Sequence, residues 1–292
     1  MRALIFGASG QDGYYLSKRL EQEGITCIMV SKSGKVGLQG DVADYEFVRA
    51  LIEKEQPEYI FDFAAISSTR HDVLFENHDT ISTGTLNILE SVRVYCPNAR
   101  VFLSGSAMQF RNEGVPINEQ TPFEARSPYA VSRIHSVYAG RYYRSQWGLR
   151  VYVGYLFNHD SPLRTEHHMN KKIVEAVKRI IAGSDEYIEI GDIEVKKEFN
   201  FAGDIVEAIW ILVNQDHVHE VVIGSGMAYS IKDFVRYCFQ KTGKDWSQYI
   251  RGNHAYVPEY QVLVSDPHLM FSLGWKPKMG FEELADMMLE EV

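Results

Sequence analysis

The sequence predicts an α/β protein built on a doubly wound parallel sheet, with a smaller α/β region on its C-terminal side. Short apolar strands alternate with amphipathic helical stretches in the first half of the chain. A glycine-rich turn separates the first strand from the first helix, and the alternation becomes less regular after residue 157. Such a repetition is typical of a parallel sheet covered on both faces, which is the Rossmann-type arrangement.

Five apolar runs are expected to form the strands of this sheet: residues 3–6, 26–30, 59–64, 101–104 and 151–157. Leu16 and Leu20 lie one helical turn apart and Gly24 supplies a stop, which predicts a helix over about 11–23. Later elements are expected as helices near 77–92 and 127–147 and over 171–182, 204–213, 231–241 and 281–291, with a strand over 187–190.

Composition excludes several classes of function. The 292 residues include 30 basic and 39 acidic side chains, a net charge of −9, which disfavours binding to nucleic acid or an anionic membrane. No apolar run approaches the roughly 18 residues of a membrane span, and the N-terminus lacks a signal-peptide pattern, so the cytoplasm is expected. Cys27, Cys96 and Cys238 lie far apart, and we expect buried thiols in a reducing compartment.

The turn "GASGQDGYYL" predicts a dinucleotide site. Gly7, Gly10 and Gly13 fit G-x-x-G-x-x-G, in which the first glycine makes the turn and the second lets a pyrophosphate approach the backbone. The third allows close packing of helix on strand, and the helix N-terminus supplies partial positive charge. A strand before the turn and a helix after it favour this interpretation over a purely structural turn.

The end of the second strand bears on the choice of dinucleotide. It reads Val30, Ser31, Lys32, Ser33, without the carboxylate that binds a ribose 2′-hydroxyl, so NADP(H) is favoured over NAD(H) unless Lys32 merely points to solvent. Asp41 is expected beside the adenine, or as the cap of a helix starting near Tyr45. The full set of expected cofactor residues is Gly7, Ser9, Gly10, Gln11, Asp12, Gly13, Ser31, Lys32, Asp41, Val42, Ala64, Ala65, Tyr129, Arg133 and Leu156.

Five stretches make the chain resemble a known family. They read "GASGQDGYYL", "TPFEARSPYAVSR", "LFNHDSPLR", "IGDIEVKKEFNFAGDIVEAIW" and "LGWKPKMGFEELADMM". The chain resembles the extended short-chain dehydrogenase/reductase family, most closely its GDP-mannose 4,6-dehydratase branch, and is also similar to GDP-4-keto-6-deoxymannose reductases. The resemblance implies a GDP-sugar or related nucleotide sugar as substrate. It also implies an NADP-binding domain over 1–157, with a return segment at about 199–224, and a nucleotide-sugar-binding region over 158–198 and 225–292.

The family's tyrosine of Y-x-x-x-K corresponds to Tyr129, but Arg133 stands where the family has lysine. A free tyrosine has a pKa of about 10, so action as a base near neutral pH needs a nearby cation. Arginine keeps the charge but is longer and planar, so the exchange is not neutral. Tyr129 and Arg133 are therefore expected either to work as a catalytic pair or to be structural.

The chain departs from the family's pattern at two further positions, directly after the strand predicted over 101–104. The resemblance implies a threonine and a glutamate at Gly105 and Ala107. Ser106, or else Ser104, is expected to replace the hydroxyl, but neither can replace the carboxylate. Glu113 and Glu119 on the following loop could approach a sugar, although most loop carboxylates are only solvated. Hydride transfer needs only the tyrosine, whereas loss of water across C5 and C6 needs a second acid/base group.

Some of the family's substrate-binding positions have matching residues in this chain, and others do not. Asn158 is expected near the sugar diphosphate, or in an Asx turn. Lys171 and Lys172 match a basic pair facing the nucleotide, or are solvated, and Lys197 matches a basic residue against the nucleotide sugar. An arginine that precedes proline in the dehydratases is missing from the stretch Tyr256, Val257, Pro258. His167 and His168 point in different directions on a helix, and no metal site is expected.

The sequence thus predicts an NAD(P)-dependent enzyme of the dehydratase type with an atypical active site. The alternatives are a GDP-4-keto-6-deoxy-sugar reductase or an epimerase, and, in another class, a catalytically silent nucleotide-binding scaffold. By family analogy we expect a homodimer or dimer of dimers, formed through the helices near 77–92 and 127–147.

Overall fold

The computed structural model describes residues 1–240, 242–253 and 256–290, and its centre is a seven-stranded parallel sheet. The strands are β1 (Arg2–Phe6), β2 (Thr26–Ser31), β3 (Leu38–Gln39), β4 (Tyr59–Asp62), β5 (Arg100–Ser106), β6 (Arg150–Leu156) and β11 (Glu220–Ile223). Their order in space is β3-β2-β1-β4-β5-β6-β11. The predicted doubly wound sheet is therefore confirmed, with β1 at the point where the strand order reverses.

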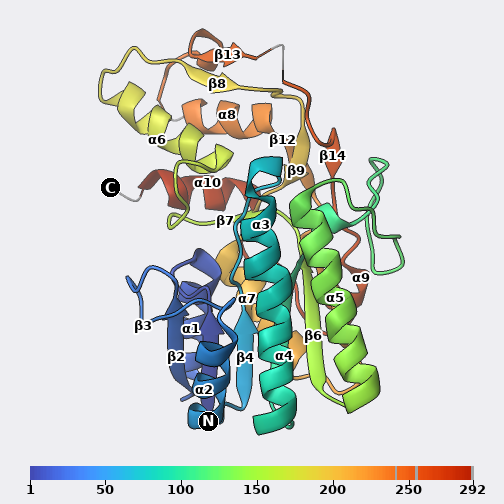
Figure 1. The fold of residues 1–292 in the computed structure, drawn as a ribbon. Helices are drawn as coiled ribbons and strands as arrows, with labels where there is room; N and C mark the ends of the chain where they lie inside the picture. Colours follow the sequence, from blue (N-terminus) through green and yellow to red (C-terminus); the bar gives the residue numbers. More distant parts are fainter. Residues whose placement is uncertain (241, 254–255, 291–292) are drawn as a thin grey trace.

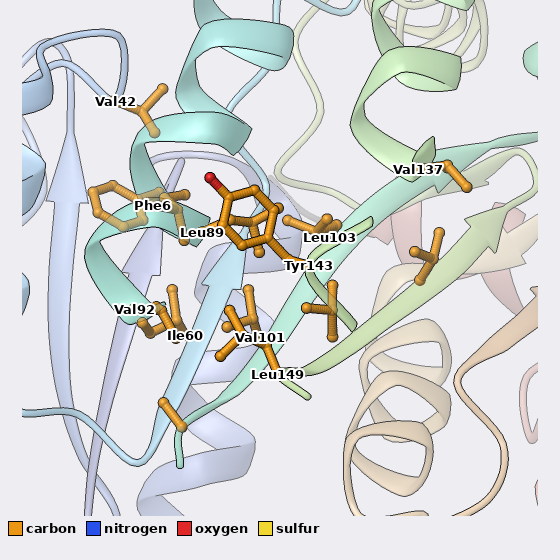
Figure 2. Packing of buried hydrophobic residues seen from close by; sticks show 14 of the residues in the cluster. Phe6, Val42, Ile60, Leu89, Val92, Val101, Leu103, Val137, Tyr143 and Leu149 are labelled. Carbon is orange, nitrogen blue, oxygen red and sulfur yellow. The ribbon is translucent and has the colours of Figure 1, made fainter. Parts of the chain in front are cut away.

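Side chains alternate along each strand, so the sheet has apolar side chains on both faces, and helices bury both of them. Leu4 and Phe6 of β1 belong to the core under α2 (Tyr45–Glu55), α4 (Gly84–Tyr95) and α5 (Pro128–Trp147). Ala3 and Ile5 belong to the opposite core, under α1 (Gln11–Gln22) and α7 (Ala202–Val213). Figure 2 shows the first core, where Leu89 and Tyr143 from helices lie over Val101 and Leu103 of β5.

Local signals set the helix ends. Ser127 caps α5 by accepting a hydrogen bond from the Ala130 amide, and Gly148, at φ 67°, ends the helix in the left-handed region. Asp44 caps α2 by accepting from the Phe47 amide. The alternative role of Asp41 as cap of this helix is therefore wrong, since the helix starts one turn too late for its carboxylate.

A second body packs at the carboxyl edge of the sheet (Figure 1). Its helices α6 (Met169–Ile181), α8 (Ile231–Gln240) and α10 (Phe281–Glu290) share a third hydrophobic core with β8 (Ile188–Ile190). The other short elements are β7 (His159–Asp160), β9 (Lys196–Glu198), β10 (Asn200–Phe201), β12 (Ala228–Ser230), β13 (Ile250–Gly252), β14 (Val262–Leu263) and α9 (His268–Ser272). α7 and β11 return the chain to the main sheet, where β11 pairs in parallel with β6.

Most expected elements agree with the structure to within two residues, and the exceptions have local causes. The strand expected over 59–64 stops at Asp62, whose carboxylate accepts the Ala64 amide and turns the chain. The helix expected near 77–92 is divided into α3 (Leu74–Asn77), a π-helical stretch over His78–Thr83, and α4. The expected ends at residues 241 and 291 lie outside the described residues.

The expectation of buried thiols holds for two of the three cysteines. Cys96 and Cys238 are buried thiols, whereas Cys27 is only partly buried, and none of the three forms a disulfide. Within the described ranges, every helix is too short or too polar to cross a membrane.

Candidate active site

The turn between β1 and α1 contains three glycines, and a side chain would be unfavourable at each of them for a different reason. Gly7 has φ 77°, and a Cβ there would lie 2.7 Å from the Ala64 nitrogen. A Cβ on Gly13 would lie 2.7 Å from the Cα of Ala8, so this glycine allows the helix to pack on the turn. A Cβ on Gly10 would meet nothing nearer than the Gly7 oxygen at 3.4 Å. Gly10 is therefore free of packing constraints, and its bare backbone leaves room for a phosphate.

A cleft of about 320 Å³ opens beside this turn at the carboxyl ends of the strands. Its walls come from the turn, the loop after β4, the end of β5, the first turns of α5 and the segment after β6. The residues predicted from the sequence that line it are Gly7, Gly10, Gln11, Asp12, Ala65, Ser104, Ser106, Tyr129, Arg133, Leu156 and Asn158. One cleft thus contains both the expected cofactor turn and the expected catalytic residues.

Tyr129 and Arg133 lie one turn apart on α5 and face the same cleft. The guanidinium carbon of Arg133 is 5.1 Å from the centre of the Tyr129 ring. Arg133 is only 5% exposed, and its Nη1 donates to the Ser104 Oγ at 2.8 Å and also to the Ser104 carbonyl. Its Nε is buried without a hydrogen-bond partner in the described part of the chain.

The two serines at the end of β5 have different hydrogen-bond states. The Oγ of Ser104 donates to the Asp62 carbonyl at 2.9 Å and accepts from Arg133, so it positions the guanidinium. Ser106 accepts from the Met108 amide at 3.2 Å, and no acceptor in the described chain takes its hydroxyl hydrogen. Ser106 is therefore the serine able to donate to a substrate oxygen.

The structure brings no loop carboxylate to the positions of Gly105 and Ala107. A Cβ on Gly105 would lie 2.7 Å from the Tyr155 ring, so a threonine does not fit there. Glu119 accepts a hydrogen bond from the Val222 amide at 2.7 Å, and Glu113 is an exposed partner of Arg111. Neither glutamate lines the cleft, and the idea that one of them approaches a sugar there is not supported.

A smaller cavity of about 140 Å³ adjoins the glycine turn on the side of β2. The predicted residues that line it are Gly7, Ser9, Lys32, Asp41, Val42, Ala64 and Ala65. Lys32 and Asp41 form an ion pair at 2.7 Å across its rim. Ser31 lies outside both linings, and its Oγ donates to the Val36 carbonyl at 2.8 Å. The apolar floor and charged rim fit the adenosine end of a dinucleotide.

A third cavity of about 250 Å³ lies in the second body and meets the main cleft at Thr69, which lines both. Lys197 lines this cavity; burial lowers the pKa of its ammonium, against the opposing effect of Asp160. Tyr256 and Pro258 line it too, so the stretch that lacks the expected arginine still reaches this site. A buried cation among aromatic side chains can bind an anionic or π-rich ligand.

The other expected substrate residues divide into two groups. Asn158 lines the main cleft, and its Oδ1 is buried with no partner among the residues described. Lys171 instead pairs with Glu175 at 3.0 Å, and Lys172 donates to the Glu189 carbonyl at 2.9 Å. Neither lysine lines a cleft next to the glycine turn.

Among the cleft residues that sequence reasoning missed, His159 and Arg164 carry titratable side chains. The Nε2 of His159 lies 3.0 Å from the Oδ1 of Asp12, and Arg164 donates to the His159 carbonyl at 3.1 Å. Both belong to the stretch "LFNHDSPLR" that was noted for its resemblance, and a charged residue directly after Asn158 was the available signal. His168, by contrast, is partly buried beside Arg164, and burial with the Arg164 charge lowers its pKa to about 4.

Comparisons with known proteins agree with this geometry. The family model for GDP-mannose 4,6 dehydratase matches residues 4–288. GDP-mannose 4,6 dehydratase 1 of Arabidopsis thaliana is 31% identical, covering 99% of this chain and 89% of the relative. GDP-mannose 4,6-dehydratase of Sinorhizobium fredii is 31% identical, covering 82% of this chain and 76% of the relative.

Solved structures share the fold at lower identity. The dTDP-glucose 4,6-dehydratase of Bacillus anthracis in complex with NAD has a TM-score of 0.86 at 19% identity, covering 99% of this chain and 96% of that one. RMD from Pseudomonas aeruginosa complexed with NADPH has the same score, identity and coverage. MoeE5 in complex with UDP-glucuronic acid and NAD has a TM-score of 0.87 at 19% identity, covering 99% and 98%.

Proposed function

The chain belongs to the GDP-mannose 4,6-dehydratase family, and from this premise we propose that it is an NAD(P)-dependent enzyme acting on a GDP-sugar or a closely related nucleotide sugar. The observation that supports this most directly is the single cleft shared by Gly7, Gly10 and Tyr129. Its continuation at Thr69 into the cavity of Lys197 gives a nucleotide sugar a second place to bind.

The residues of the glycine turn fit a nicotinamide dinucleotide. Such a cofactor accepts a hydride from, or returns one to, a sugar carbon. Gly10 and the N-terminus of α1 would bind its pyrophosphate, and the cavity rimmed by Lys32 and Asp41 its adenosine end. Lys32 supports NADP(H), because its exposed ammonium stands where a 2′-phosphate would need a cation, although its ion pair with Asp41 also leaves NAD(H) open.

Within this site Tyr129 takes or gives the proton of a sugar hydroxyl. Arg133 lies beside its ring as a fixed cation, within cation–π distance. Ser104 restrains that guanidinium, and Ser106 donates to the sugar oxygen. Tyr129, Arg133 and Ser106 would orient and polarise a carbonyl or hydroxyl group, which is the protein's share of a hydride transfer.

The cleft favours a reaction that needs hydride transfer alone. Among the described residues that line it, Asp12 is the only carboxylate, and it is paired with His159. Elimination across C5 and C6 requires a further group that moves the C5 proton, and the described residues that line the cleft include no unpaired acid for that task. We therefore place reduction of a 4-keto sugar, or C4 epimerisation through a transient ketone, ahead of dehydration.

The test is turnover on defined nucleotide sugars. Purified protein is incubated with GDP-mannose and, separately, with a GDP-4-keto-6-deoxy sugar, while nicotinamide absorbance and product mass are followed. We expect reduction of the keto sugar, and Tyr129→Phe should lower kcat at least about 100-fold with the cofactor affinity little changed. Dehydration of GDP-mannose would contradict our choice of reaction. Tight cofactor binding with no turnover on any nucleotide sugar would favour the silent scaffold.

The two bodies of the fold support a division of labour. We propose that residues 1–157, with the return segment at about 199–224, bind the dinucleotide, and that residues 158–198 and 225–292 bind the nucleotide sugar. Lys197 would then contact the nucleotide, and Asn158 would lie between the bodies beside the sugar diphosphate.

We also propose that the enzyme is a cytoplasmic homodimer, alone or as a dimer of dimers. α4 and α5 lie side by side on one face (Figure 1) and expose large apolar side chains to solvent. These are Leu86, Val94, Val131, Tyr138, Tyr142 and Trp147. A second copy presenting the same two helices would cover this face around a two-fold axis. The absence of a disulfide among the three cysteines supports the location.

A further inference from the structure

The imidazole of His159 lies between two hydrogen-bond acceptors. Its Nδ1 is 2.8 Å from the Phe157 carbonyl oxygen, and its Nε2 is 3.0 Å from the Oδ1 of Asp12. A carbonyl oxygen only accepts, so Nδ1 must be protonated. A neutral ring would then present the lone pair of Nε2 to a carboxylate, which is repulsive. Both contacts are satisfied when Nε2 also bears a proton, as an imidazolium does.

The charges around the pair agree with this state. Burial works to lower the pKa of His159, but the charge and hydrogen bond of Asp12 outweigh it and raise that pKa above its ordinary value. Burial works in the opposite sense on Asp12, whose pKa is nevertheless lowered by His159, Arg164 and Arg133. Asp160 is the other nearby carboxylate, and it is held by Asn170 at 2.6 Å and by Arg164 at 3.4 Å. Asp12 is thus the acid that neutralises His159.

The position of Asp12 gives the pair its importance. It lies in the first turn of α1, two residues after Gly10, where the proposed function places the pyrophosphate. A carboxylate there, without a counter-ion, would repel a phosphate and oppose the positive end of the helix. Asp12 is about a fifth exposed at this wall of the cleft, so the repulsion would be only partly screened.

We propose that His159 is a protonated positioning residue that neutralises Asp12 and thereby keeps the start of α1 able to bind a dinucleotide pyrophosphate. This inference rests on the proposed cofactor site. The same contact ties the cofactor turn to the segment after β6. Gln11 donates to the His159 carbonyl at 3.1 Å and accepts from Ser161 at 2.8 Å, and Arg164 donates to the same carbonyl. The contact of the His159 ring with Asp12 is therefore one of several hydrogen bonds that join the two bodies at their shared cleft.

The protonation state can be read directly from the unmodified protein. In a sample labelled with 15N in histidine, both ring nitrogens of His159 should show the signature of protonated nitrogen at neutral pH. In Asp12→Asn the amide can donate to Nε2, so the ring should become neutral with Nε2 unprotonated. A neutral His159 in the unmodified protein at neutral pH would overturn the proposal.

The functional consequence is tested by cofactor binding, measured by NAD(P)H fluorescence without any sugar. His159→Gln removes the cation that contacts the Asp12 carboxylate and should weaken binding at least about tenfold, equivalent to about 1.4 kcal/mol. The double variant Asp12→Asn/His159→Gln removes the carboxylate charge too and should recover most of the affinity. A purely structural role predicts that the double variant binds no better than His159→Gln, and that result would overturn the proposal.

The pH dependence of cofactor affinity provides a second test of the proposal. The hydrogen-bond geometry and the raised pKa of His159 both favour the imidazolium, which is lost as the pH rises through the folded value. Cofactor affinity should therefore fall on the alkaline side in the unmodified protein, and this limb should be absent in the double variant. An identical alkaline limb in both would contradict the proposal. Absent turnover with this binding pattern intact would contradict only the proposed reaction.

Discussion

At the scale of single residues, Arg133 determines the hydrogen bonds at the end of β5 in the candidate site. Its Nη1 reaches the Ser104 carbonyl and hydroxyl, which lie at the end of the neighbouring strand. The Ser104 hydroxyl is thereby engaged both as donor and as acceptor, whereas the Ser106 hydroxyl hydrogen has no acceptor among the described residues. Under the proposed function, the planar guanidinium of Arg133 leaves Ser106 as the serine that can donate to a substrate oxygen.

Asp62 lies beneath that corner and makes stability depend on pH. Burial raises its pKa to about 7, against the opposing effects of Arg133 and the Ala64 amide. Between the unfolded value of 3.8 and this value the folded state binds more protons, so stability falls as the pH rises through this window. Asp62→Asn should therefore stabilise the protein at pH 8, by up to about 4 kcal/mol.

Thermal unfolding across this pH window measures the effect. Asp185→Asn, at an exposed acid, is the matched control and should leave the profile unchanged. The prediction fails if Asp62→Asn shows the same decline with pH as the unmodified protein.

At the scale of the element, the turn into α1 separates packing from ligand binding. Gly13 lets the helix pack against Ala8, because a Cβ at this position would overlap the Ala8 backbone. A Cβ on Gly10 would meet only the Gly7 oxygen, at an ordinary contact distance. The backbone of Gly10 has φ −80° and ψ 165°, which any residue adopts. Its side chain is therefore absent for a reason other than folding.

Alanine at these two positions should have opposite effects. Gly10→Ala should change the free energy of unfolding by less than about 1 kcal/mol but weaken dinucleotide binding at least about tenfold, because its methyl group would occupy the phosphate's place. Gly13→Ala should destabilise the fold by about 1–3 kcal/mol, since its Cβ would overlap the backbone of Ala8. Denaturant unfolding and cofactor titration of both variants decide the matter; equal losses of stability would refute it.

At the scale of the whole molecule, the chain leaves the main sheet and returns to it. β11 adds to β6 after α6, β8 and β9 have been placed in the second body. This crossing brings Thr69, Asn158 and Lys197 around connected cavities, although they come from distant parts of the sequence. The candidate active site is therefore formed by the two bodies together.

The apolar face of α4 and α5 gives the prediction for assembly. Tyr142→Glu places a charge at the centre of the proposed contact and should convert the dimer to a monomer in light scattering. Ile181→Glu, at an equally exposed apolar side chain at the end of α6, should leave the mass unchanged. A monomeric unmodified protein would exclude this contact.

The sequence by itself determined the parallel sheet, the glycine turn and the pairing of Tyr129 with Arg133, because alternation, turn chemistry and helical spacing are local properties. Only the tertiary structure decided which serine is free, which lysine lines a cavity and that His159 meets Asp12. Those outcomes depend on contacts between residues such as 12 and 159, whose separation of 147 positions leaves no periodic trace in the chain. Long-range packing and hydrogen bonding assign such partners, and a motif supplies only the groups that take part.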